Sequence, residues 1–199
     1  MRTDNANLLA CLAHATAQDR HQHILGLTAA MAAFLLRDGP WQQAATLHQT
    51  AATTAHRHND RTAEANALHE LGRVRHLTGD YAQAAELHER ALTLYQDLGN
   101  RHGEANTLHD LGRVRHLTDD YAQAAELHER ALTLYQDLGN RHGEANTLWD
   151  LGRVRHLTGD FAEAAELLER ALNLFRQVGD LQGEAEVLNS KGALLAESA

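Results

Sequence analysis

Apolar and small side chains recur every three or four residues along most of the chain, the spacing that places them on one face of a helix. Within residues 101–140 the pattern includes Leu108 and Leu111 in the first half and Ala124 and Ala131 in the second. Each half is long enough for a helix of about 17 residues, with polar residues in between. The pattern therefore predicts two amphipathic helices joined by a short turn.

This pattern is copied along the chain at a period of 40 residues. Residues 61–100 match residues 101–140 at 35 of 40 positions without a gap, and residues 141–180 match them at 29 of 40. Residues 21–60 form a degenerate copy, and residues 181–199 restart the pattern but stop before a second helix. A period of this kind is typical of a solenoid. We therefore expect an all-α solenoid of antiparallel helix pairs with about ten helices.

The two ends of the array differ from its middle. The leucine spacing of residues 1–20 predicts an N-terminal helix, and residues 181–199 predict a capping helix because Lys191 stands where the copies have a core leucine. The first helix of the degenerate copy is apolar almost all round, which indicates a buried helix that the N-terminal helix, a partner or further sequence must cover. Its apolar residues include Met31, Phe34, Leu35 and Leu36.

Turn and capping residues separate the predicted helices. Gly79 and Gly99 are suited to the left-handed conformation that ends a helix, and Asp119 takes that place in the middle copy. An aspartate then begins each following helix, with Gln or Glu three residues later, which is the pattern of a capping box. The expected pairs are Asp80 with Gln83, Asp120 with Gln123 and Asp160 with Glu163.

Composition narrows the class of protein further. The formal net charge of −9 argues against a general nucleic-acid binder. Cys11 is the only cysteine, so neither an intramolecular disulfide nor a multi-cysteine zinc site can form. The longest apolar run, residues 24–36, is too short to cross a bilayer, and the N-terminus lacks the layout of a secretory signal. We expect a cytoplasmic protein without a membrane partner.

Each copy carries Leu-Gly in its first helix, as at Leu111 and Gly112, and alanines spaced as Ala124 and Ala131 in its second. This helix pair resembles the tetratricopeptide repeat (TPR). Its 40 residues exceed the usual repeat of about 34 and are similar to the subclass in kinesin light chain. The phrases LGRVRHLTGDY and LHERAL resemble the C-terminal sensor arrays of actinobacterial regulators that carry an NB-ARC-type ATPase. The resemblance, strong over residues 61–195 and weak over 21–60, implies a right-handed superhelix.

The copies depart from the family pattern at two positions. Arginine replaces the aromatic residue in the middle of the first helix, and we expect its stem to pack on the helix pair while its guanidinium reaches a neighbouring carboxylate. Histidine replaces the aromatic residue of the second helix, and Leu168 in the last copy indicates that these histidines are half-buried core residues. The substituted residues are Arg75, Arg115 and Arg155, and His48, His88 and His128.

The resemblance also implies a concave groove lined by the first helices. The predicted site residues are Asn66, Asn106 and Asn146; His69, His109 and Trp149; Arg73, Arg113 and Arg153; and His76, His116 and His156. In the family, asparagine amides at such positions bind a peptide backbone, and arginine recognises carboxylates, so the hypothesis is an extended acidic peptide. The alternative is simple copying, which places the same residues in every repeat whether needed or not. Trp149 either anchors a partner or packs on the next first helix near Leu188.

Catalytic residues, a metal site and a cofactor are not expected. His76, His116 and His156 lie one repeat apart, and helices about 8–10 Å apart cannot bring such a row round one zinc ion. The chain holds no HExxH motif and no GxxxxGK[ST] segment, so any ATPase would lie outside it. Three hypotheses follow: a peptide- or protein-binding scaffold, a sensor module of a larger regulator, and a self-associating array that forms homo-oligomers.

Overall fold

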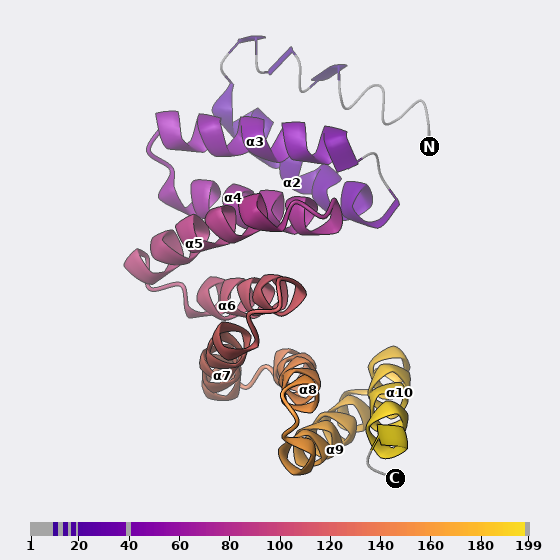
Figure 1. Cartoon of the computed structure of the whole chain (residues 1–199). Coiled ribbons are helices and arrows are strands. Elements are labelled where there is room, and N and C mark those ends of the chain that lie inside the picture. Colours follow the sequence, from indigo (N-terminus) through magenta and orange to yellow (C-terminus); the bar gives the residue numbers. More distant parts are fainter. Residues whose placement is uncertain (1–9, 12–13, 16, 19, 39–40, 198–199) are drawn as a thin grey trace. The chain divides into compact units, whose positions relative to one another are not determined.

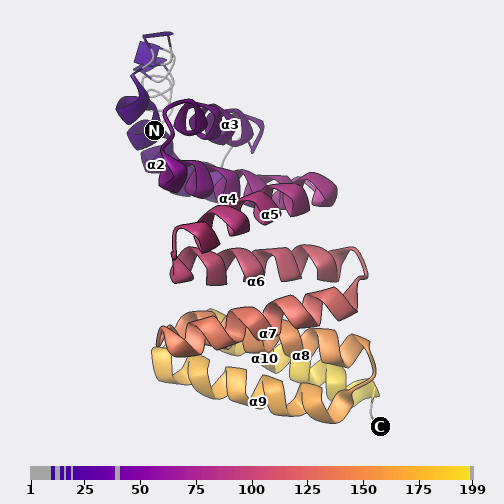
Figure 2. The ribbon, with the colours of Figure 1, turned by 90° about the vertical axis from the view of Figure 1, so that its left-hand side faces the viewer.

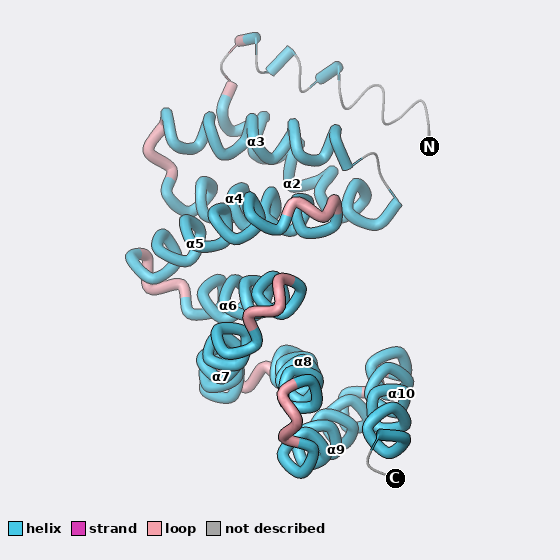
Figure 3. Tube along the Cα trace, viewed as in Figure 1, coloured by secondary structure: helices cyan, strands magenta, loops and turns pink. Residues whose placement is uncertain are grey.

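The computed structural model describes residues 10–11, 14–15, 17–18, 20–38 and 41–197, and in this part of the chain all regular structure is α-helical (Figures 1 and 3). The predicted N-terminal helix lies largely outside the described residues, as do the side chains of Phe34, Leu35 and Leu36. The helices are α2 (His21–Asp38), α3 (Trp41–Arg57), α4 (Arg61–Leu77), α5 (Tyr81–Asp97), α6 (Arg101–Leu117), α7 (Tyr121–Asp137), α8 (Arg141–Leu157), α9 (Phe161–Val178) and α10 (Leu181–Glu197).

The chain divides into two compact units, Met1–Gly99 and Asn100–Ala199. Unit 1 contains α2 to α5 and unit 2 contains α6 to α10. Within each unit consecutive helices pack as antiparallel pairs, and Figure 2 shows this for α6 to α9. We call α2, α4, α6, α8 and α10 the first helices and α3, α5, α7 and α9 the second helices. The first helices also contact one another within a unit, α2 with α4, α6 with α8, and α8 with α10. The predicted all-α solenoid of helix pairs is confirmed.

The turns follow the predicted chemistry, with one exception. Gly79 and Asp119 have φ angles of 78° and 60°, the left-handed conformation expected at the end of α4 and α6. The carboxylate of Asp120 accepts a hydrogen bond from the backbone N–H of Gln123, at 3.3 Å, and Asp80 does the same with Gln83.

The capping box predicted at Asp160 and Glu163 was wrong, because both carboxylates have other partners. Asp160 accepts a hydrogen bond from the hydroxyl of Thr158 at 3.1 Å and makes no side-chain cap on α9. The carboxylate of Glu163 lies 3.1 Å from Nε of Arg155. The same guanidinium donates to Glu129 on α7 at 2.7 Å, so the predicted contact of this arginine with a neighbouring repeat is confirmed.

In the three later pairs a histidine or leucine of the second helix packs directly on a glycine of the first helix. A Cβ added at Gly112 would lie 2.7 Å from the His128 ring, and one at Gly152 would lie 3.0 Å from Leu168. His128 is 0% exposed and His48 is 2% exposed. The histidines were predicted to be half-buried and are completely buried. For His88 and His128 the reason is the facing glycine, which lets the two helices approach until no solvent reaches the ring.

Candidate peptide-binding surface

All twelve predicted site residues lie on first helices, four on α4 in unit 1 and eight on α6 and α8 in unit 2. Within each helix they follow one another at spacings of three or four residues, so they occupy one side of the helix. The structure gives each of the four sets a different environment.

The asparagines are held by tyrosines of the second helices. The hydroxyl of Tyr95 donates to Oδ1 of Asn66 at 2.7 Å, and that of Tyr135 donates to Oδ1 of Asn106 at 2.8 Å. Burial, followed by the charge of Glu70, raises the pKa of Tyr95 to about 12, so its phenol keeps the proton it donates. The bond fixes the amide orientation and directs the NH₂ group away from the tyrosine. The sequence analysis missed this contact, although a tyrosine stands 29 residues after both Asn66 and Asn106.

The last copy lacks this arrangement. Phe175 replaces the tyrosine and has no hydroxyl, and Nδ2 of Asn146 instead donates to the backbone carbonyl of His142 at 2.9 Å. Asn146 therefore turns toward its own helix, whereas Asn66 and Asn106 are held from the second helix.

Two members of the second set, His109 and Trp149, join neighbouring first helices. Nε2 of His109 on α6 lies 3.0 Å from Oδ2 of Asp150 on α8, and Nε1 of Trp149 donates to the hydroxyl of Ser190 on α10 at 2.9 Å. Each contact spans 41 positions, so it is the same joint in two successive repeats. Of the two interpretations of Trp149, the structure shows the contact with the next first helix. Its role as an anchor for a partner stays a hypothesis.

Asp150 is a buried carboxylate surrounded by basic groups. It is 4% exposed, and besides His109 it has Nη1 of Arg153 at 3.3 Å and Nε of Arg113 at 3.9 Å. Burial opposes its ionisation, but the hydrogen bond and charge of His109, with the charge of Arg113, outweigh burial and hold the pKa of Asp150 well below its usual range. The carboxylate is therefore ionised at neutral pH and ties α6 to α8.

The arginines are the solvated cations of this surface. The side chains of Arg73, Arg113 and Arg153 are 45%, 48% and 42% exposed. Each has a carboxylate three residues earlier, as at Arg73, whose Nη1 lies 3.2 Å from both carboxylate oxygens of Glu70. An exposed pair such as that of Arg73 is worth only about 0.2–0.5 kcal/mol, so this guanidinium can exchange partners at low cost. Arg113 and Arg153 instead lie against the buried carboxylate of Asp150.

The fourth set packs against aromatic residues at the start of the second helices. The rings of His76 and His116 stand edge-on to Tyr81 and Tyr121, with centroids 5.9 Å apart in both cases. Partial burial, followed by the charge of Arg153, lowers the pKa of His116, so its ring is neutral at neutral pH. His116 therefore contributes ring packing rather than positive charge.

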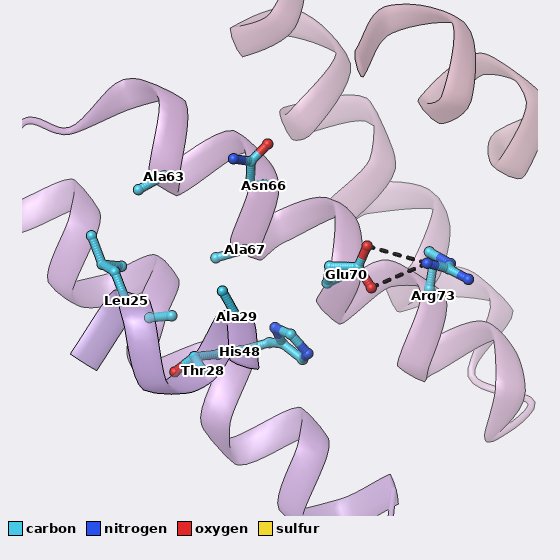
Figure 4. A pocket seen from close by; sticks show the side chains of 10 residues that line it. Leu25, Thr28, Ala29, His48, Ala63, Asn66, Ala67, Glu70 and Arg73 are labelled. Atoms are coloured by element: carbon cyan, nitrogen blue, oxygen red, sulfur yellow. Dashed lines mark hydrogen bonds and ion pairs between the residues drawn. The ribbon is translucent and has the colours of Figure 1, made fainter. Parts of the chain in front are cut away.

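A pocket of about 450 Å³ lies in unit 1 beside this surface (Figure 4). Residues of α2, α3 and α4 line it: Leu25, Thr28, Ala29, His48, Ala51, Ala63, Asn66, Ala67, Glu70 and Arg73. The sequence analysis predicted Asn66 and Arg73 as site residues but not the pocket. It placed His48 in the core and attached no role to Thr28 or Ala29.

The described residues contain neither a metal cluster nor a membrane span. No group of three His, Cys, Asp or Glu side chains is placed to hold a metal ion. No helix there combines the length and apolar character needed to span a bilayer.

Comparison with known proteins is consistent with the repeat. A family model described as tetratricopeptide repeat matches residues 24–97, 63–137, 103–177 and 143–198. No curated protein sequence matches the chain. Among solved structures, BtubC (BKLC) from P. vanneervenii is similar with a TM-score of 0.71 and 18% identity, over 97% of this chain and 90% of that one.

Two further structures share the fold. Aspartyl phosphate phosphatase F from Bacillus subtilis has a TM-score of 0.74 and 11% identity, over 84% of this chain but only 43% of the phosphatase. The nearly identical TPR-like repeats of a Podosopora anserina protein of the kinesin light chain type have a TM-score of 0.65 and 20% identity, over 88% of this chain and 97% of that one. At these identities the likeness concerns the fold alone.

Proposed function

Because the chain belongs to the tetratricopeptide repeat family, we propose that it is a non-enzymatic module that binds a protein or an extended peptide. The proposed binding surface is formed by the predicted site residues of the first helices. In unit 2 it comprises α6 and α8, where Asn106, Arg113 and Arg153 present amide and guanidinium donors. We further propose that the peptide is acidic, since carboxylates match these donors.

One observation carries the proposal: the polar groups are oriented before any ligand arrives. Asn106 is fixed by the buried hydroxyl of Tyr135, and Arg113 and Arg153 both lie against Asp150. A donor that is already ordered loses little conformational entropy on binding, so more of its interaction energy appears as affinity. Simple copying explains why these residues recur. It does not explain why buried side chains orient their polar groups.

A selection from a displayed peptide library against the full chain tests this proposal. We expect the selected peptides to be acidic and their affinity to fall as salt rises, because exposed charges are screened. Replacing Asn106 and Arg113 together with Ala should then lower affinity at least tenfold, since a hydrogen bond to a charged group is worth about 1.5–3 kcal/mol. Because Asn106→Ala also deprives Tyr135 of its acceptor, the single variant Arg113→Gln is measured as well.

The matched control is Glu166→Ala with Arg170→Ala on the exposed face of α9. It removes two polar side chains of the same unit away from the proposed surface and should leave affinity unchanged. Equal affinity of the wild type and both groove variants would refute the proposal.

The exposed leucines of α10 favour one second candidate function, self-association. Leu181, Leu188 and Leu195 are 79%, 46% and 67% exposed, and their spacing of seven residues places them near one side of the helix. Light scattering over a range of protein concentrations tests this candidate, and a monomer at every concentration would exclude it. The resemblance to sensor arrays of NB-ARC regulators remains a hypothesis that the gene upstream of Met1 can test.

A further inference from the structure

The pocket of unit 1 exists because the degenerate copy has small residues where the later copies have large ones. Thr28 stands at the position of Leu68, Leu108 and Leu148, which are at most 1% exposed. Ala29 stands at the position of His69, His109 and Trp149. The first pair therefore lacks both a core leucine and an aromatic ring that each later pair has.

In the later pairs that ring covers the buried histidine of the second helix. The rings of His109 and His128 are 5.4 Å apart, tilted by 55°, and those of His69 and His88 are 5.4 Å apart, tilted by 57°. Neither ring nitrogen of His128 has a hydrogen-bond partner, so ring packing is the contact that stabilises it. In the first pair, Ala29 offers His48 no such ring.

The carboxylate that bonds the histidine ring in the later repeat also has a counterpart at the pocket. His109 reaches Asp150, 41 positions later, and the residue 41 positions after Ala29 is Glu70, which lines the pocket. Glu70 pairs with Arg73 at 3.2 Å as Asp150 pairs with Arg153 at 3.3 Å. In unit 1 the carboxylate of this contact is therefore present, as Glu70, but the ring that would bond it is absent, because Ala29 takes its place.

Two side chains of the pocket are more than nine-tenths buried and have polar atoms without a partner among the described residues. They are Oγ1 of Thr28, 3% exposed, and Nε2 of His48, 2% exposed. A threonine inside a helix ordinarily bonds the carbonyl four residues earlier, as Thr107 does at 2.8 Å, but Thr28 does not. Leaving such groups unpaired costs about 1–3 kcal/mol each, so the packing of the first pair around Thr28 and His48 is incomplete.

From this arrangement we propose that the pocket binds a histidine side chain of the peptide partner, with the imidazole over His48 and a ring N–H directed at Glu70. The inference rests on the proposed peptide-binding function and adds a specificity pocket to it. Figure 4 shows Ala29 of α2 and Ala67 of α4 near the His48 ring, with Glu70 beyond it.

The acceptor distinguishes imidazole from other aromatic rings. In this chain the imidazole of His109 meets a carboxylate, whereas the indole of Trp149 meets the neutral hydroxyl of Ser190. Glu70 supplies a carboxylate, and hydrogen bonds to a charged acceptor favour the more polar imidazole N–H. Leu25, Ala29, Ala51, Ala63 and Ala67 give the ring apolar walls.

The side chain alone, as 4-methylimidazole, is the probe for the site, titrated into the isotope-labelled full chain and followed by NMR. We expect saturable shifts of the methyl signals of Ala29, Ala51 and Ala67, with a Kd on the order of 1 mM, an ordinary value for so small a ligand. 3-Methylindole, the side chain of tryptophan, should bind about tenfold more weakly. Absence of saturable shifts, or tighter binding of 3-methylindole, overturns the proposal.

Three variants make the test specific. Ala29→His supplies the missing ring from the chain itself, and we expect it to abolish binding of 4-methylimidazole and to raise the melting temperature. Ala29→Ser is the matched control, which leaves the pocket open and the Kd unchanged. Glu70→Gln keeps the shape but removes the charge, and should weaken binding about tenfold. Binding to Ala29→His that equals wild-type binding would overturn the proposal.

The outcomes separate this inference from the proposed function. Selected peptides that lack histidine and bind Ala29→His as well as they bind the wild type overturn the pocket assignment and leave peptide binding intact. Saturable binding of 4-methylimidazole that Ala29→His abolishes, with no selectable peptide, supports the imidazole site and refutes peptide binding. Pocket signals that shift with protein concentration alone assign the site to a second copy of the chain and overturn the proposal.

Discussion

Replacing His128 with Leu should stabilise unit 2 at neutral pH. The ring is 0% exposed and neither of its nitrogens has a hydrogen-bond partner. Leu168 holds the equivalent position in the last copy, beside Gly152, so the backbone of this repeat accepts leucine there. Removing buried polar atoms that lack partners removes a penalty of about 1–3 kcal/mol each, and we expect His128→Leu to raise the free energy of unfolding by about 1–3 kcal/mol.

The same substitution should make the free energy of unfolding depend less on pH in the acidic range. Burial, opposed by the charge of Asp150, lowers the pKa of His128 from 6.5 to about 3. The unfolded state therefore binds a proton that the folded state does not, and the neutral ring's contribution is complete above the unfolded pKa and is lost as pH falls toward 3. The loss is about 1.4 kcal/mol per pH unit between roughly pH 6 and pH 4. His128→Leu has no such group and lacks this share of the loss.

Urea unfolding at about pH 7 and about pH 4.5 measures both effects, because the other titrating groups cancel between wild type and variant. A Trp41→Phe background leaves Trp149 as the single fluorescent reporter of unit 2. His102→Leu, an exposed change on α6, is the matched control and should stay within about 0.5 kcal/mol of the wild type. A His128→Leu variant that is less stable at neutral pH, or that loses as much stability in acid as the wild type, would refute the reasoning.

Three further substitutions have definite expected outcomes. Gly112→Ala should destabilise the protein by about 1–3 kcal/mol in thermal unfolding, since its Cβ would meet a buried ring at 2.7 Å, whereas Gly26→Ala, with nothing within 4 Å, should be neutral or stabilising. Phe175→Tyr should supply a hydroxyl to Asn146 and stabilise by about 0.5–1.5 kcal/mol; an unchanged amide orientation in its crystal structure would contradict this. Asp150→Asn should lower the free energy of unfolding of unit 2 near neutral pH. It should also reduce the loss of stability as pH falls below about 3.8, because the folded pKa of Asp150 lies below its unfolded value. Urea unfolding at several pH values tests this, and an equal loss of stability in acid for wild type and variant would contradict it.

The fold was predictable because its signals are local. Periodic apolar residues set the helices, and residues such as Gly79 and Asp119 take the positive φ angles that the turn requires. Those features depend on a few neighbouring residues and on exact repetition. The failed cap at Asp160 shows the limit, because Thr158 and Arg155 compete for the carboxylates and the sequence does not rank such competitors.

The side-chain partners of the candidate site were less accessible to sequence reasoning. The tyrosine that holds Asn106 and the carboxylate that meets His109 lie on other helices, so finding them requires the packing register between helices. The replacement of two large residues by Thr28 and Ala29 was visible in the aligned copies. Whether this replacement leaves a pocket or a collapsed core depends on how α2, α3 and α4 pack around the smaller side chains.

The joint between first helices bears on how the array can grow by gene duplication. If a second copy of residues 101–140 were inserted after the first, the copy of Asp110 would stand 41 positions after His109, where Asp150 stands now. The contact between the two first helices would then form without further mutation. A second copy of residues 141–180 would instead set Trp149 against a buried aspartate in place of Ser190. The array can therefore lengthen by copies of residues 101–140, whereas residues 141–180 are matched to the helix that carries Ser190.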